Sequence, residues 1–330
     1  MSGVRSPKIV LGAGNVGDRT IDSYARYDTP EEVNALLDTF YKRGGRAIDT
    51  ARNYSIHAPG TSEPRLGVAD AGARFSIDTK VGTTTTAVGN TFNDKSSVHA
   101  SIDASLADLK LPDVVKIDVL YLHLPDGKTP FKETLEAVDE AYRQGKFRRF
   151  GLSNFSAEQV EEFLAISKRN GYIAPTVYQG HYNAVVRSAE RDLLPVLRKH
   201  GIAFYVYSPA AGGFFHGKQQ RARPGSRFDR SLYSGYFSKP TIQSAVDQAV
   251  EVAANHGISG HAAALRWNAY HSQLDYNKGD AIVIGASSPA QLSSNLDTVD
   301  DGPLPQEVAE AINGIYGQLR PEDDIPYNAS

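Results

Sequence analysis

The chain has 330 residues, no cysteine and a formal net charge of −3, with 41% hydrophobic and 22% charged residues. These values are ordinary for a globular protein. They exclude disulfides, thiolate catalysis and cysteine-ligated metals, and they indicate neither a nucleic acid nor a membrane as partner. No run approaches the ~20 apolar residues of a membrane span and no signal peptide opens the chain, so we expect a cytoplasmic protein.

Short apolar strands alternate with longer amphipathic segments along the whole chain. Eight strand candidates lie near residues 8–12, 46–49, 76–80, 118–122, 148–152, 176–179, 203–207 and 281–285. Repeated strand–helix alternation favours a parallel sheet covered by helices, and eight strands favour a closed barrel over an open doubly wound sheet. We therefore predict a (β/α)8 TIM barrel that forms a single domain over residues 1–330, because such barrels run to ~250 residues or more as one unit.

Helix signals lie between the strand candidates. Thr29 and Pro30 open one helix as N-cap and first helical residue, and Ser156 opens another with capping-box spacing to Gln159. Further helix patterns cover residues 134–143, 190–199 and 305–319, and an acidic, proline-containing tail follows the last of them.

A long connection, residues 210–238, follows the seventh strand candidate. It is rich in Gly, Arg and Tyr, and with Lys239 just beyond it contains six basic residues, among them Lys218 and Arg227. Loops of this length are usually functional or disordered. Both a cover over an anionic ligand and a merely solvated loop are open, and we favour the cover.

The run from Gly12 through Gly14 to Gly17 is similar to the glycine fingerprint of open dinucleotide-binding folds. No clear helix opens from it, so we interpret it as the first barrel loop. His261 and His271 lack the spacing of a helical metal pair, and no metal site is expected.

Four side chains suited to acid–base chemistry fall at or just past the ends of strand candidates: Asp49, Tyr54, Lys80 and His123. In a parallel barrel the C-terminal strand ends meet at one rim, where chain-distant residues form a site. Each residue alone has a commoner structural explanation, such as a helix cap, half-buried packing, a solvated rim lysine or a hydrogen-bonded structural histidine. Their spacing and joint occurrence favour a catalytic site.

An acid, a phenol, an amine and an imidazole together can deliver a proton to a carbonyl oxygen. Hydride transfer to a carbonyl builds negative charge on its oxygen, so a general acid must lie within hydrogen-bond reach. The phenol pKa of ~10 is high for this task, and a nearby cation lowers it. We predict Tyr54 as the acid, Lys80 and Asp49 as the pair that tunes it, and His123 as the group that orients the carbonyl or shares in proton delivery.

These residues belong to a set of motifs that resembles the aldo-keto reductase superfamily over nearly the whole chain. The set comprises Asp49-Thr-Ala-Arg-Asn-Tyr54, Lys80, Leu120-Tyr-Leu-His123, Gly151-Leu-Ser-Asn-Phe155, Tyr205-Val-Tyr-Ser-Pro209 and the segment 285–295. The run Pro175-Thr-Val-Tyr-Gln-Gly-His-Tyr-Asn183, with Ala211-Gly-Gly213 and Gly217-Lys218, is most similar to the aflatoxin-aldehyde reductase branch.

The resemblance implies a nicotinamide cofactor at the same rim. Tyr207 would stack on the nicotinamide, with Ser208 beside it, and the carboxamide would meet Ser153, Asn154 and Gln179. The pyrophosphate would meet Gly213 and Lys218.

The segment after the last strand candidate would hold the adenosine and its 2′-phosphate. Ser287, Gln291 and Asn295 fall four residues apart on one face of a short helix, whose N-terminus suits a phosphate. Polar residues four apart also mark any solvent face. Many family members carry a Lys or Arg beside the serine, and this chain has none there; Arg227 would supply the charge. We predict NADPH rather than NADH.

The leading hypothesis is an NADPH-dependent reductase of a small-molecule aldehyde or ketone. The alternatives are a nucleotide-binding barrel that serves as a non-catalytic partner or redox-sensing subunit, and an unrelated barrel hydrolase or isomerase. The similar branch is often dimeric, which leaves a homodimer open.

Overall fold

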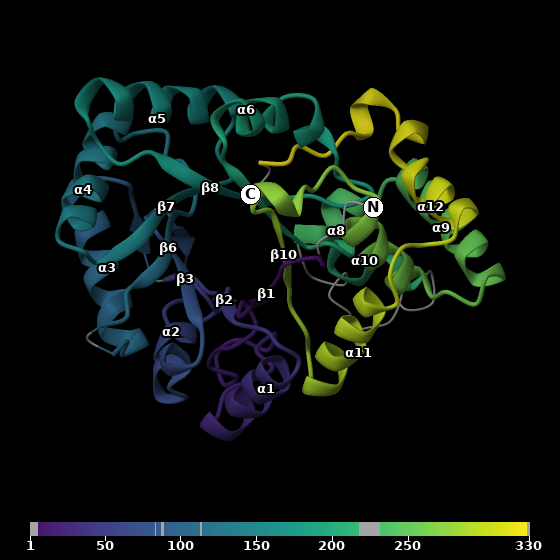
Figure 1. The fold of residues 1–330 in the computed structure, drawn as a ribbon, viewed down its shortest axis with the longest axis horizontal. Coiled ribbons are helices and arrows are strands. Elements are labelled where there is room, and N and C mark those ends of the chain that lie inside the picture. The colour runs from purple at the N-terminus through teal and green to yellow at the C-terminus, as the bar shows by residue number, and fades with distance from the viewer. Residues whose placement is uncertain (1–5, 83, 87–88, 113, 218–231, 329–330) are drawn as a thin grey trace.

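The strands of the computed structural model close into a parallel eight-stranded barrel, which confirms the predicted fold (Figure 1). The structure describes residues 6–82, 84–86, 89–112, 114–217 and 232–328. The barrel order is β1-β10-β9-β8-β7-β6-β3-β2. These strands are β1 (Ile9–Gly12), β2 (Ala47–Asp49), β3 (Ser76–Val81), β6 (Ile117–Leu122), β7 (Phe147–Ser153), β8 (Pro175–His181), β9 (Ala203–Tyr207) and β10 (Ala281–Ile284). Each begins and ends within two residues of its predicted bounds.

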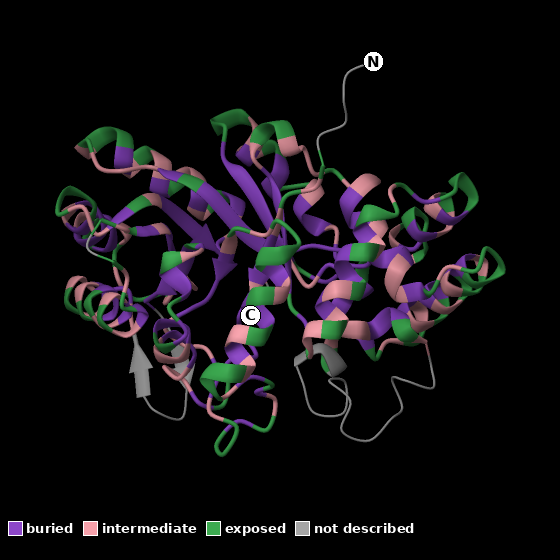
Figure 2. Cartoon of the chain, turned by 60° about the horizontal axis from the view of Figure 1, so that its bottom comes forward, coloured by how far each residue is buried: buried purple, intermediate pink, exposed green. Residues whose placement is uncertain are grey.

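Helices surround the barrel, and their buried faces lie toward the strands while their exposed faces point outward (Figures 1 and 2). They are α1 (Pro30–Lys42), α2 (Ser62–Val68), α3 (Lys95–Leu109), α4 (Phe131–Arg143), α5 (Ala157–Asn170), α6 (Leu193–His200), α8 (Leu232–Phe237), α9 (Pro240–Asn255), α10 (Gly260–Tyr270), α11 (Pro289–Asp300) and α12 (Gln306–Asn313). The predicted caps are confirmed, because Thr29 with Glu32 and Ser156 with Gln159 form reciprocal capping boxes. Within the described residues, no helix combines the length and hydropathy that a bilayer crossing requires.

Three predicted helices are wrong in their bounds. The helix predicted over 134–143 begins three residues earlier, at Phe131. The helix predicted over 305–319 ends at Asn313, and the 3-10 turn η5 (Tyr316–Gln318) follows it. Gly314 occupies the C-cap, where a residue of poor helix propensity readily ends a helix. The helix predicted from 190 begins at Leu193, because Pro195 has no N–H and fits the first turn of a helix but not its interior.

Two other regions differ from the expectation in detail. A small antiparallel sheet of β4 (Thr84–Thr86) and β5 (Gly89–Thr91) follows β3 and was not predicted. The long connection after β9 is partly helical, with η3 (Ala211–His216) at its start and α8 at its end. The segment after β1 is a loop up to α1, as predicted for the glycine-rich run.

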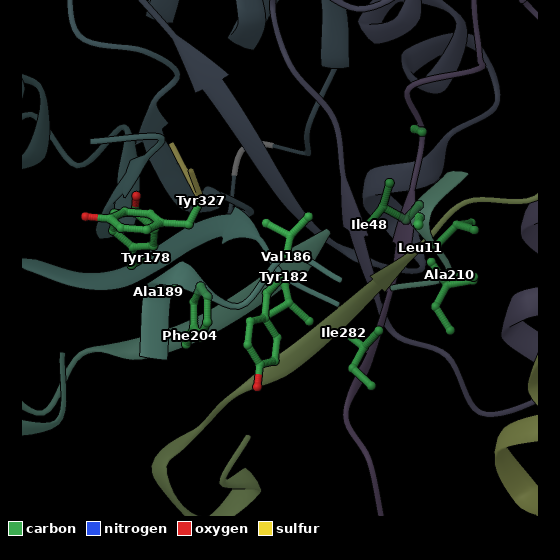
Figure 3. Close-up of a cluster of buried hydrophobic side chains, with 14 of the residues drawn as sticks. Leu11, Ile48, Tyr178, Tyr182, Val186, Ala189, Phe204, Ala210, Ile282 and Tyr327 are labelled. Atoms are coloured by element: carbon green, nitrogen blue, oxygen red, sulfur yellow. The ribbon is translucent and has the colours of Figure 1, made fainter. Parts of the chain in front are cut away.

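The apolar core has two layers because successive residues of a strand face opposite sides. Inside the barrel lies a cluster formed by Val10, Val119, Tyr121, Val177, Ala203, Tyr205, Ala281 and Val283. Between the barrel and its helices lies a larger cluster, part of which is drawn in Figure 3 with Leu11, Ile48, Phe204 and Ile282. The two layers fix the strand ends that carry the predicted site.

Strand pairing brings the predicted site residues to one rim. The register pairs Gly12 with Asp49, Lys80 with Tyr121, Ser153 with Gln179, and His181 with Tyr207. All of these pairs lie at or near the C-terminal ends of their strands, where loops are free to carry function.

Candidate active site

Lys80 is the centre of the predicted catalytic group. Its ammonium nitrogen donates to both carboxylate oxygens of Asp49, with Nζ···Oδ1 2.7 Å and Nζ···Oδ2 2.6 Å, and to the backbone carbonyl of Thr50 at 2.9 Å. The exposed fractions of Lys80 and Asp49 are 1% and 2%. Charges this deeply buried persist only when they are paired and hydrogen-bonded, so each of these two residues depends on the other.

The environment of Lys80 favours its charged form. Burial disfavours the ammonium, but the negative charge of Asp49 and the hydrogen bonds to Asp49 and Tyr54 outweigh burial, so the pKa of Lys80 is raised. The amide of Gln179 donates to Asp49 Oδ1 at 2.7 Å and fixes the carboxylate from the opposite side of the barrel. The result is a cation favoured in its charged form and held at a fixed position on the rim.

The Tyr54 hydroxyl meets this cation. It lies 3.3 Å from Lys80 Nζ, which is also 4.8 Å from the centre of the Tyr54 ring. The backbone carbonyl of Tyr54 accepts hydrogen bonds from the N–H groups of residues 60–62, each at 3.1 Å, which fix the turn before α2. Gly14 packs against the ring, since a Cβ there would lie 3.6 Å from a ring carbon. Two loops therefore position the phenol next to the ammonium.

His123 completes the group. Its ring lies edge-to-face with Tyr54, with centroids 5.8 Å apart and an interplanar angle of 77°. Its Nδ1 atom is buried and has no hydrogen-bond partner among the described residues. Burial, helped by the charge of Lys80, lowers the pKa of His123 to about 3, so the imidazole is neutral at pH 7.

Asn154 connects this group to the residues expected at the nicotinamide. Its Nδ2 donates to the His123 carbonyl at 3.2 Å and to Ser153 Oγ at 3.1 Å, while its Oδ1 accepts from the Tyr207 hydroxyl at 2.9 Å. The φ of Asn154 is +64°, in the left-handed region that Asn tolerates better than most residues. Because Ser156 is the N-cap of α5, Asn154 is not needed to begin that helix.

A cavity of about 420 Å³ opens beside these residues. Its wall contains Asp49, Tyr54, Tyr207, Ser208, Gly213, Ser287, Gln291 and Asn295 from the predicted set. As far as the structure describes the wall, Lys80, His123, Ser153, Asn154 and Gln179 are not part of it. Hydrogen bonds or a ring contact join them to its lining residues, and Ser153 is joined through Asn154. The Tyr207 ring stacks on His181, with centroids 5.3 Å apart and planes 10° from parallel.

The start of α11 forms another part of the wall. Ser288 is the N-cap, and its side chain accepts from the Gln291 N–H. Ser287 donates through its N–H and its hydroxyl to Gln291 Oε1, at 2.6 and 2.7 Å. Asn295 Oδ1 lies 2.9 Å from His261 Nε2. The three predicted adenosine residues therefore share one surface, although each already has an internal partner.

Several lining residues were missed by sequence reasoning. Arg26 lies in the first barrel loop, and its guanidinium donates to the Ser23 carbonyl at 3.2 Å. Asn15 and Tyr27 anchor this loop to the Ala286 carbonyl, at 2.6 and 3.0 Å. Arg26 follows the end of β1 by 14 residues, so its position in the sequence gave no signal. His216 and His261 also line the cavity, and no sequence pattern joins them.

Two predicted residues, Lys218 and Arg227, lie outside the described residues. Within the described parts of the chain, no group of three His, Asp or Glu side chains could hold a metal ion. The chemistry available at this rim is that of a buried cation, a phenol and a neutral imidazole.

The chain is similar to known proteins over most of its length. Residues 8–317 match the family model described as the aldo/keto reductase family. Aflatoxin B1 aldehyde reductase member 4 of Homo sapiens is 38% identical, over 94% of this chain and 94% of the relative. Aflatoxin B1 aldehyde reductase member 2 of Rattus norvegicus is 37% identical, over 96% and 86%, and oxidoreductase sirO of Leptosphaeria maculans is 33% identical, over 97% and 96%.

Proposed function

Because this chain belongs to the aldo/keto reductase family, and so is an oxidoreductase of carbonyl compounds, we propose that it reduces an aldehyde or ketone with hydride from NADPH and a proton from Tyr54. The observation that carries this proposal is the position of Lys80 Nζ, which bridges the buried carboxylate of Asp49 and the hydroxyl of Tyr54. A cation in this position stabilises the phenolate that remains after the proton has left.

The four residues have different roles in the proposed reaction. Tyr54, which lines the cavity, is the group that donates the proton to the carbonyl oxygen. Lys80 stabilises the charge left on the phenolate, and Asp49 keeps Lys80 charged and in place. His123 is neutral at pH 7, so it orients the carbonyl as a hydrogen-bonding group rather than as a cation.

The proposed cofactor fits the donor set of the cavity. When bound, the reduced nicotinamide supplies the hydride. Tyr207 on the cavity wall offers it an aromatic face. Asn154, Ser153 and Gln179, which adjoin the wall through hydrogen bonds to Tyr207 and Asp49, are the proposed partners of its carboxamide. The N-terminus of α11 next to Ser287 suits a phosphate, because the positive end of the helix dipole favours an anion there.

NADPH is proposed over NADH because basic residues are available for the 2′-phosphate. Arg26 lines the cavity beside the loop that follows β10, and Arg227 stands in the connection after β9. Gly213 and Lys218 are the proposed pyrophosphate contacts. The substrate is proposed as a small aldehyde or ketone, in keeping with the aldehyde reductases among the relatives. The cytoplasmic location and the homodimer stay predictions.

The deciding experiment measures NADPH oxidation with a panel of aldehydes and ketones, for the wild type and for Tyr54→Phe. The proposal expects wild-type turnover and a loss of about 10²- to 10⁴-fold in kcat for the variant, because Phe cannot donate a proton. Calorimetric titration should give the same NADPH Kd for both proteins. NADPH binding without turnover by the wild type would favour the alternative, a non-catalytic nucleotide-binding barrel.

A further inference from the structure

Two histidines from separate elements form a parallel pair on the wall of the cavity. The rings of His216, the last residue of η3, and His261, in the first turn of α10, have centroids 4.6 Å apart and planes 2° from parallel. Both residues line the same cavity as Tyr54. Nothing in the proposed proton transfer uses them.

The backbone is built so that these rings can meet. A Cβ at Gly260 would lie 2.2 Å from the carbonyl oxygen of Phe215, so only glycine allows α10 to approach η3 this closely. Gly213 has a φ of +99°, and a Cβ there would lie 3.3 Å from His216 Cδ2. The His216 ring therefore lies over Gly213. His261, the residue after Gly260, brings the second ring against it.

One ring of the pair is fixed from a third element. His261 Nε2 lies 2.9 Å from Asn295 Oδ1 on α11, and its Nδ1 atom is buried with no hydrogen-bond partner within the described part of the chain. Leu265 lies one turn further along α10 and also lines the cavity. The wall at this point thus carries two parallel aromatic rings with an apolar neighbour.

The pair is uncharged at neutral pH. Burial lowers the pKa of His216, and burial together with the neighbouring His216 lowers the pKa of His261, although the hydrogen bond to Asn295 opposes this shift. Two cationic rings at this separation would repel one another, whereas two neutral rings stack. A neutral aromatic surface recognises a planar base better than it recognises a phosphate.

We propose that the His216–His261 pair is the stacking surface for the adenine ring of the nucleotide cofactor. This inference rests on the proposed function, because it assigns the other end of the same ligand. The nicotinamide has to reach Tyr54, so the adenine of an extended dinucleotide lies at the other end of the cavity. The pair lines the same cavity and is tied to Asn295 on α11, the helix whose start is proposed for the phosphate.

The test is a set of calorimetric Kd measurements for NADPH and NADH, with His216→Ala, His261→Ala and His216→Phe. We expect the alanine variants to weaken the binding of both nucleotides by about fivefold or more, because one stacked base contributes ~1 kcal/mol or more. His216→Phe keeps a ring and should stay close to the wild type. His256→Ala is the matched control, since His256 pairs with Glu307 at the surface, and it should not change either Kd.

A second measurement separates the adenine from the rest of the ligand. Reduced nicotinamide mononucleotide has no adenine, so kcat/KM with this cofactor should be the same in all variants. Unchanged NADPH and NADH affinity in both alanine variants would overturn the inference. So would a loss confined to NADPH, which would make the pair a phosphate ligand, or an equal loss with the mononucleotide, which would mean general damage to the site.

The outcomes for the two proposals are distinguishable. A wild type that binds neither NADPH nor NADH contradicts the proposed function and this inference together. A wild type that reduces aldehydes with NADPH, while His216→Ala and His261→Ala keep their affinity, contradicts the inference alone. Thermal melting of each variant shows whether a lost affinity reflects a lost fold.

Discussion

Two aspartates, Asp49 and Asp78, are paired on neighbouring strands of the barrel, but their hydrogen-bond partners differ. The register pairs Asp49 at the end of β2 with Asp78 within β3, and both are almost fully buried. Asp49 accepts two hydrogen bonds from Lys80 and one from Gln179. Within the described residues, the Asp78 carboxyl accepts a single hydrogen bond, from the backbone N–H of Val119 at 3.1 Å.

The difference shows that a buried carboxyl group stays ionised only when a cation is paired with it. Burial raises the pKa of Asp78 to about 8, and the nearby carboxylates of Asp118 and Asp49 add to the shift. Asp78 is therefore mostly protonated at pH 7. The ammonium of Lys80 gives Asp49 the partner that Asp78 lacks, and only the paired carboxylate stands next to Tyr54. The comparison yields three predictions.

The largest effect is expected from separating the Lys80–Asp49 pair. Lys80→Met leaves Asp49 buried and unpaired, and it should lower the free energy of unfolding by ~3–5 kcal/mol. Urea denaturation measures this loss. Turnover should also fall by about 10²-fold or more, because Tyr54 loses the cation that stabilises its phenolate.

The double variant Lys80→Met with Asp49→Asn sharpens this result. It removes both charges, so it should recover much of the lost stability while turnover stays low. Equal stability of wild type and Lys80→Met would contradict the mutual dependence of the pair. Turnover restored in the double variant would remove Lys80 from the proposed mechanism.

The sequence was sufficient to predict the barrel and the four central residues. The eight strands are apolar runs with clear ends, and Asp49, Lys80 and His123 stand directly at those ends. The sequence shows which residues stand at strand ends, and in a parallel barrel the C-terminal strand ends all meet at one rim. Residues up to 74 positions apart, from Asp49 to His123, can therefore be assigned to one rim from the sequence.

Features that depend on contacts between distant elements could not be predicted. Helix α2 has only seven residues and no side-chain cap, and it fits against α3 because Gly67 has no Cβ to meet the Asp108 carbonyl. The hydrogen bond from Gln179 to Asp49 and the stacking of His216 on His261 join positions that share no local pattern. Such partners become visible only when strand order and helix packing are known.

A pH-dependent effect on stability is expected for Asp78→Asn. The pKa of Asp78 is raised from 3.8 to about 8 in the folded chain, so its protonated form favours folding. That stability is fully present below the unfolded pKa and is lost as the pH rises through the folded pKa. The unfolding free energy of the variant, minus that of the wild type, should therefore grow by up to ~1.4 kcal/mol per pH unit between about pH 4 and 8.

Urea denaturation at several pH values measures this difference. Asp139→Asn is a suitable control, because Asp139 is also buried but accepts from Arg143 and from the Ile173 N–H. For this control, the unfolding free energy of the variant minus that of the wild type should not grow as the pH rises. A stability difference for Asp78→Asn that stays constant from pH 4 to 8 would contradict the raised pKa of this carboxyl.

The smallest effect is expected for Tyr121→Phe, in the layer just beneath Lys80. The Tyr121 hydroxyl is buried and has no hydrogen-bond partner within the described residues, and its ring packs against the Gly151 backbone, where a Cβ would lie 2.4 Å from a ring carbon. Removing an unsatisfied hydroxyl while keeping the ring should leave the unfolding free energy unchanged or raise it by up to ~1 kcal/mol.

Tyr178→Phe is the matched control: its hydroxyl donates to the Phe155 carbonyl at 2.6 Å, so losing it should cost about 1 kcal/mol or more. Equal losses in the two variants would mean that the Tyr121 hydroxyl is as well satisfied as that of Tyr178, and that the layer beneath the site is not as poorly paired as Asp78 indicates.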